Sequence, residues 1–96
     1  MGFVYAILLW PDDMPTRIKV GYSVDPRRRL KTFRTSAPQA RFVGVWACRS
    51  GRHDEYRLHE YLDDYRVGGE VFDFDPDDLI EVIEGDFCLP KAMESP

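Results

Sequence analysis

The first half of the chain contains apolar segments that are short and bounded by turn residues. Residues 3–10 are continuously apolar and rich in aromatic and branched side chains, which is typical of a buried strand. After the turn cluster 11–16, residues 17–22 alternate polar and apolar side chains, as a half-buried strand does. These two segments predict a hairpin, and the apolar segment 42–48 predicts a third strand.

Two helices are predicted around this third strand. Asp25-Pro26 combines an N-cap residue with a proline in the first turn, so a helix is expected to begin there and to run to Thr35. A second helix is predicted over residues 51–65, where four apolar side chains follow the i, i+3, i+4, i+7 spacing of an amphipathic helix: Leu58, Tyr61, Leu62 and Tyr65. Gly68-Gly69 then ends it.

The C-terminal third predicts one more strand and one more helix. Residues 71–74 form a short apolar segment, and Asp75-Pro76 repeats the helix-start signal, with Gly85 as the expected C-cap. Residues 85–96 carry few apolar groups and are expected to be a loosely ordered tail. The whole pattern predicts one α+β domain over residues 1–84. Its helices would pack on a small, largely antiparallel sheet of three to four strands, in the order β-β-α-β-α-β-α.

The composition agrees with one small globular domain. The chain has 96 residues, of which 44% are apolar and 31% charged, and this balance excludes a disordered chain. Its longest apolar run is far below the ~20 residues of a membrane span, so we expect no membrane association and a cytoplasmic location. Cys48 and Cys88 show no CxxC spacing, which argues against a disulfide framework or a zinc ribbon.

Charge is distributed unevenly along the chain. Residues 1–52 contain 10 Lys and Arg against 3 Asp and Glu, whereas residues 53–96 contain 3 against 14. One interpretation is a cationic face that binds a polyanion beside an acidic region. The other is two solvated surfaces of opposite sign that attract each other within the fold, and the charges alone do not separate the two.

Six short motifs follow one another over residues 2–74. In chain order they are FVY at 3–5, KVG at 19–21, DP at 25–26, RL at 29–30, ExxLH at 55–59 and GEVF at 69–72. In this order and spacing the chain resembles the GIY-YIG nuclease superfamily. The similarity is to its compact branch, found in phage open reading frames and in meiotically up-regulated gene products, which carries a KIG strand and a GEWF segment.

The resemblance implies a GIY-YIG-like fold and metal-dependent hydrolysis of phosphodiester bonds in nucleic acid, with DNA the expected substrate. Tyr5 matches the tyrosine that orients or deprotonates the attacking water, and Arg29 matches the phosphate-binding arginine. Glu55 matches the single metal-binding glutamate, and a hard carboxylate suits Mg²⁺ or Mn²⁺. Because no further recognition domain follows, we expect low sequence specificity.

Two more residues are candidates for catalysis. Lys19 stands where most of the superfamily has a second tyrosine, and it could direct charge toward the phosphate or act as a base. His59 lies one helical turn after Glu55 and could contact phosphate or orient the glutamate. We expect the side chains of Tyr5, Lys19, Arg29, Glu55 and His59 to converge on one concave surface. We also expect nearby cations to keep Glu55 ionised.

Around Arg29, the first helix carries further basic residues that could contact the nucleic-acid backbone regardless of its sequence: Arg27, Arg28, Lys31 and Arg34. The competing hypothesis is a catalytically weak or inactive module that keeps the fold and binds nucleic acid or protein. Many members of the superfamily place an asparagine about three turns after the metal glutamate, and this sequence contains none. Glu70 comes closest to that place.

The sequence fits a calcium loop or a zinc site less well. Four carboxylates match positions of an EF-hand loop, namely Asp73, Asp75, Asp77 and Glu84, but Asp78 stands where the sharp turn requires glycine. Pro76 is better explained by entry into a helix. Two cysteines and two histidines, Cys48, His53, His59 and Cys88, lack the spacing of zinc ligands.

Overall fold

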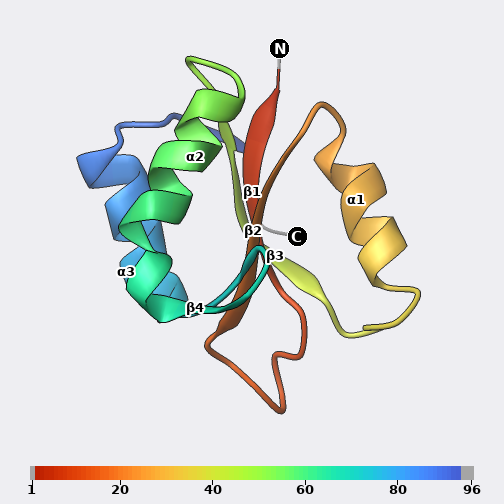
Figure 1. Ribbon diagram of the computed structural model, residues 1–96. Coiled ribbons are helices and arrows are strands. Elements are labelled where there is room, and N and C mark those ends of the chain that lie inside the picture. The colour runs from red at the N-terminus through yellow and green to blue at the C-terminus, as the bar shows by residue number, and fades with distance from the viewer. Residues whose placement is uncertain (1, 94–96) are drawn as a thin grey trace.

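The computed structural model, which describes residues 2–93, contains an antiparallel sheet between two layers of helices (Figure 1). The helices are α1 (Pro26–Phe33), α2 (Arg52–Tyr61) and α3 (Pro76–Glu81), with a 3₁₀ turn η1 (Asp63–Tyr65) and a π turn η2 (Val82–Asp86). The strands are β1 (Phe3–Leu8), β2 (Arg17–Ser23), β3 (Arg41–Ala47), β4 (Arg66–Gly68), β5 (Val71–Asp73) and β6 (Lys91–Met93). Their order across the sheet is β4-β5-β2-β1-β3-β6.

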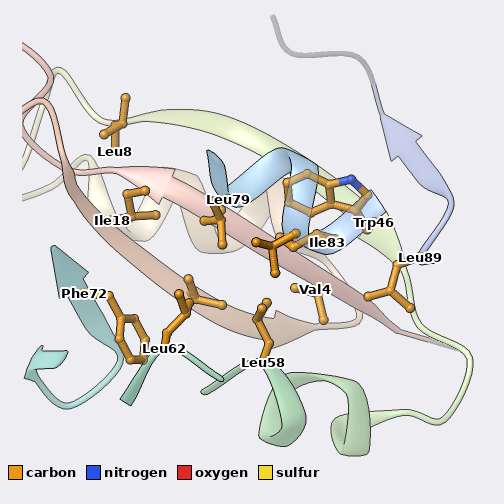
Figure 2. Packing of buried hydrophobic residues seen from close by; sticks show 13 residues of the cluster. Val4, Leu8, Ile18, Trp46, Leu58, Leu62, Phe72, Leu79, Ile83 and Leu89 are labelled. Carbon is orange, nitrogen blue, oxygen red and sulfur yellow. The ribbon is translucent and has the colours of Figure 1, made fainter. Parts of the chain in front are cut away.

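Strand β1 lies at the centre and is covered on both faces, which explains why its sequence is continuously apolar. Val4, Ala6 and Leu8 point into a core that α2 and α3 cover, and Figure 2 shows this packing. The alternate residues Tyr5 and Ile7 point into a second core, on the face that α1 covers. A side chain of β1 therefore reaches α1 or α2 according to its position along the strand.

Both predicted helix starts are confirmed by their cap geometry. The Asp25 carboxylate accepts a hydrogen bond from the backbone N–H of Arg28, and the Asp75 carboxylate accepts bonds from the N–H groups of Asp77 and Asp78. Asp75 is therefore a helix cap. Glu84, the last carboxylate of the EF-hand match, accepts a hydrogen bond of 2.9 Å from Nε1 of Trp46.

The α+β class is confirmed, but the predicted number of strands is wrong. The sheet has six strands, because two segments of three residues, β4 and β6, pair with its edges. The predicted helix over residues 51–65 ends at Tyr61, and the chain then turns through η1 into β4. Gly69 allows the tight turn from β4 to β5, since its φ of 55° is one that other residues rarely adopt.

The segment predicted as a loose tail contributes to the fold up to the last described residue. Leu89 is buried, and the Pro90 carbonyl accepts a hydrogen bond of 2.9 Å from the Ala47 N–H beside β6. Gly85 lies inside η2, and its φ is not positive, so it is not the predicted C-cap. Residues 94–96 lie outside the described part of the chain. Within residues 2–93, no helix has both the length and the apolar character needed to cross a membrane.

Candidate active site

A cleft of about 370 Å³ lies where the two helical layers meet the edge of β2. Strand β5 pairs only with Arg17–Lys19 of β2. Beside the second half of β2, side chains from α1 and α2 can therefore approach each other. Residues from β1, β2, both helices and the turn before β5 line the cleft: Tyr5, Tyr22, Ser23, Val24, Arg29, Arg52, Glu55 and Glu70. Tyr5, Arg29 and Glu55, which were predicted from the sequence, are among them.

Tyr5 reaches the cleft by lying across Gly21. The two residues are cross-strand partners, and a Cβ atom added to Gly21 would be 2.3 Å from the Tyr5 hydroxyl. Only glycine at this position leaves room for the ring. The glycine of the KVG motif is thus required by the placement of Tyr5 on the neighbouring strand.

Burial raises the pKa of Tyr5 above its usual value. A hydrogen bond from Arg29 and the positive charge of Arg29 act in the opposite direction but do not outweigh burial. The Tyr5 phenol therefore keeps its proton at neutral pH. In this state the hydroxyl can orient a water molecule by hydrogen bonding, whereas deprotonation of the water would require a phenolate.

Arg29 is exposed on α1 and packs against an aromatic ring. Its guanidinium carbon lies 5.1 Å from the centroid of Phe33, one helical turn further along. The Lys19 ammonium lies 5.3 Å from the same centroid, and the Tyr5 ring is also close, with a centroid separation of 6.3 Å. Phe33 thus holds two cations near the cleft. The i+4 spacing of Phe33 from Arg29 is the sequence signal that could have indicated this contact.

Glu55 is buried near the start of α2, with 6% of its surface exposed. The adjacent Asp54 fixes this end of the helix, because its carboxylate accepts hydrogen bonds of 2.7 and 3.1 Å from the N–H groups of Arg49 and Ser50. An Arg52 nitrogen lies 3.8 Å from Glu55. Arg52 also stacks on Tyr22, at 5.1 Å from its ring centroid.

The cations near Glu55 are not the main influence on its ionisation, in contrast to the expectation from the sequence. Burial and then the negative charge of Glu70 raise the pKa of Glu55, and the opposing effects of His59 and Arg52 are smaller. Burial and Glu70 together therefore outweigh the two neighbouring cations at Glu55.

His59 and Glu70 are both held by the peptide groups of Val20. His59 Nε2 lies 2.8 Å from the Val20 carbonyl oxygen, and the Val20 N–H donates to the Glu70 carbonyl at 3.0 Å. The Lys19 ammonium lies 3.4 Å from a carboxylate oxygen of Glu70. Among residues 2–93, Glu55, His59 and Glu70 form a group whose candidate metal-ligand atoms lie within 4.8 Å of one another.

Three of the five predicted catalytic residues line the cleft, and the other two do not. Tyr5, Arg29 and Glu55 line the cleft, as expected. Lys19 and His59 do not line it, but Lys19 pairs with Glu70, and His59 lies close to Glu55 and Glu70. Glu70 was predicted from the sequence as the nearest substitute for a missing asparagine and as the first alternative to Glu55 for binding the metal. Tyr22 was noted only as a tyrosine just beyond Gly21, and Arg52 was not predicted to belong to the site. The glutamate of the GEVF motif was the available signal for Glu70.

The other basic residues of α1 do not face this cleft. Arg27, Arg28 and Lys31 line a separate open groove of about 680 Å³ along the helix. Arg34 instead donates a hydrogen bond of 2.8 Å from Nε to the Ala40 carbonyl, which ties the end of α1 to the loop before β3.

Comparison with known protein families identifies the family of this chain. The T5orf172 domain profile matches residues 2–85, nearly the whole described chain. The chain belongs to the T5orf172 domain family. This family is phage-associated and is related to nuclease-type folds. No curated protein and no solved structure is similar enough to this T5orf172 domain to count as a match.

Proposed function

We propose that this T5orf172 domain is a GIY-YIG-type endonuclease that hydrolyses phosphodiester bonds of nucleic acid, DNA first, with low sequence specificity. The observation that carries the proposal is the convergence of Tyr5, Arg29 and Glu55, from β1, α1 and α2, on one cleft. A group that contacts water, a group that contacts phosphate and a carboxylate for a cation are the parts that such hydrolysis needs.

The donor chemistry of the cleft fits a divalent cation. Glu55 offers a carboxylate on a buried side chain, in an environment that raises its pKa, and a second carboxylate and an imidazole lie within 4.8 Å. Glu55 would hold Mg²⁺ or Mn²⁺. When bound, such an ion supplies Lewis-acid stabilisation of the phosphate and lowers the pKa of a coordinated water.

The remaining roles belong to side chains of the chain itself. The exposed Arg29 guanidinium, backed by Phe33, binds two nonbridging phosphate oxygens. The protonated Tyr5 hydroxyl accepts a hydrogen bond from the attacking water or donates one to it, and this bond fixes the water's direction of approach. Lys19, paired with Glu70, holds that carboxylate in place and adds positive charge behind the phosphate.

Replacing Tyr5 by Phe tests the proposed reaction directly. We expect cleavage of supercoiled plasmid in Mg²⁺ or Mn²⁺, none in chelator, and a ~10²–10⁴-fold slower rate in Tyr5→Phe, because the water loses its orienting hydroxyl. Tyr61→Phe is the matched control, since the Tyr61 ring is exposed, contacts Phe87 and is not part of the cleft lining. Equal rates for the wild type and Tyr5→Phe would remove Tyr5 from the mechanism.

The groove along α1 predicts binding that depends on salt and tolerates sequence changes. In Arg28→Gln/Lys31→Gln we expect weaker binding to all duplex sequences alike, and a salt slope that is smaller by about 1 for each lost phosphate contact. Fluorescence anisotropy over a salt series measures both quantities. Arg41→Gln/Arg57→Gln, which removes the same charge elsewhere, should leave the slope nearly unchanged. A salt-independent affinity would indicate a protein partner.

A binding module without turnover is the second candidate. It is favoured by Lys19, which occupies the place of the second tyrosine and is paired with Glu70 in this structure. Such a module would show the same binding and salt dependence as the wild-type nuclease, yet no nicked or linear plasmid in either cation. The cleavage assay therefore separates the two functions.

A further inference from the structure

We infer that His59 and Glu70 complete a three-residue metal site with Glu55, and that this site binds Mn²⁺ more tightly than Mg²⁺. The inference rests on the proposed function only in that Glu55 binds a divalent cation. It names two further ligands and a preferred ion. The three candidate ligand atoms come from α2 and from the turn before β5, and they lie within 4.8 Å of one another.

The hydrogen bond of His59 fits a metal ligand. A carbonyl oxygen can only accept, so at 2.8 Å from the Val20 carbonyl the His59 Nε2 carries the proton. In the neutral imidazole, Nδ1 is then the nitrogen with a free lone pair. Metal-binding histidines almost always donate their other ring N–H to a carbonyl or a carboxylate in this way, which fixes both the tautomer and the ring. The ring is also packed on Phe72, at a centroid separation of 5.2 Å.

Glu70 is fixed by the same residue of β2. Its backbone carbonyl accepts the Val20 N–H at 3.0 Å, so one residue of β2 sets the positions of both His59 and Glu70. Lys19 approaches one oxygen of the Glu70 carboxylate at 3.4 Å, and the side chains of Glu70 and Glu55 are close enough for a hydrogen bond. Two carboxylates held this close repel each other, and a cation between them removes the repulsion.

The imidazole sets the preference between the two ions. Mg²⁺ demands oxygen ligands and usually retains several waters, whereas Mn²⁺ stands above it in affinity for sites that contain nitrogen. A site built from Glu55 alone would discriminate little between the two ions. A site with two carboxylates and His59 Nδ1 should bind Mn²⁺ tightly enough to detect without nucleic acid.

Metal binding to the full chain, without nucleic acid, tests the inference. We expect titration calorimetry to show tighter binding of Mn²⁺ than of Mg²⁺, and pulsed EPR of the Mn²⁺ complex to show ¹⁴N coupling from the imidazole. In His59→Gln the Mn²⁺ affinity should fall ~10–100-fold and the coupling should vanish, while Mg²⁺ binding changes less. In Glu70→Gln both ions should bind more weakly. Glu60→Gln, the exposed neighbour of His59, is the control and should bind like the wild type.

The outcomes separate this inference from the proposed nuclease. Bound Mn²⁺ without ¹⁴N coupling, or unchanged affinities in Glu70→Gln, would overturn the three-residue site and leave a nuclease with Glu55 as its sole ligand. Loss of cleavage in Tyr5→Phe together with the expected coupling would support both. If His59→Gln fails to fold, the coupling measured on the wild-type protein still decides the role of His59.

Discussion

Glu55→Gln is expected to abolish cleavage and, in the same protein, to raise the thermal midpoint measured in chelator. Cleavage is lost because a neutral amide replaces the carboxylate that a divalent cation requires, and we expect a decrease of at least ~10³-fold. Stability rises because the substitution removes a buried charge that faces Glu70. A carboxamide keeps the volume and can donate a hydrogen bond to the Glu70 carboxylate.

The pH dependence of stability gives this prediction its sign. Burial and Glu70 raise the pKa of Glu55 in the folded protein above the ~4.3 of an unfolded glutamate, so the folded state binds more protons between the two values. The favourable contribution is complete below the unfolded pKa and is lost as pH rises through the folded pKa. The wild type should therefore lose stability over this window, and Glu55→Gln should not.

Thermal melts from mild acid to neutral pH, with and without Mn²⁺, measure both effects. Glu60→Gln is the matched control, since this exposed carboxylate lies on the same helix outside the site. Mn²⁺ should raise the midpoint of the wild type and of Glu60→Gln but not that of Glu55→Gln. A Glu55→Gln protein that is less stable at every pH would make Glu55 a structural ion-pair partner of Arg52 instead.

The parts of the fold that could be predicted are those whose signals are local. The apolar run of β1, the alternation in β2 and the Asp-Pro caps of α1 and α3 each depend on a few neighbouring residues. Strands β4 and β6 have three residues each, and they exist because β5 and β3 offer edges to pair with. Neither segment carries a period of its own, so the sequence could not reveal them.

The length of α2 shows how a tertiary contact overrides periodicity. Tyr65 continues the i, i+3, i+4, i+7 pattern, which favours helix to that residue, yet its ring packs edge-on against Phe74 at 4.9 Å after the chain has turned. Asp63 and Arg66 form an ion pair at 3.1 Å across this turn, and Arg66 also donates to the Gly69 carbonyl. The i, i+3, i+4, i+7 spacing is present in the sequence, but Tyr65 packs against Phe74 from the turn that follows the helix.

The site, like the fold, has parts that local motifs predict and parts that depend on tertiary contacts. Tyr5, Arg29 and Glu55 could be placed because each belongs to a motif at a fixed spacing. The contribution of Glu70 depends on where β5 begins along β2, a register that no local pattern contains. The pKa direction of Glu55 was also out of reach, since its charge balance depends on burial and on Glu70, which lies fifteen residues further along the chain.

Gly21→Ala is expected to lower both the stability of the fold and the rate of cleavage. The new Cβ would lie 2.3 Å from the Tyr5 hydroxyl and 2.5 Å from its Cζ, so the ring must leave its place over β2. Overpacking of this kind costs roughly 1–3 kcal/mol in stability. Displacement of the hydroxyl by even ~1 Å should slow cleavage about 10²-fold, because the water loses its orientation.

Two further variants distinguish displacement of the Tyr5 ring from a general effect of alanine on a strand. Gly68→Ala makes the same change in β4, where nothing lies within 4 Å of the added Cβ and φ is not positive, so its midpoint and rate should stay close to the wild type. In a Tyr5→Ala background there is no ring to displace, and Gly21→Ala should then have little further effect on stability. Denaturant melts of the four proteins in this cycle give the coupling between the two residues. The added Cβ on β2 would meet the Tyr5 ring of β1 directly, so strong coupling is expected. Additive effects would mean that Gly21 is needed for a reason other than making room for Tyr5.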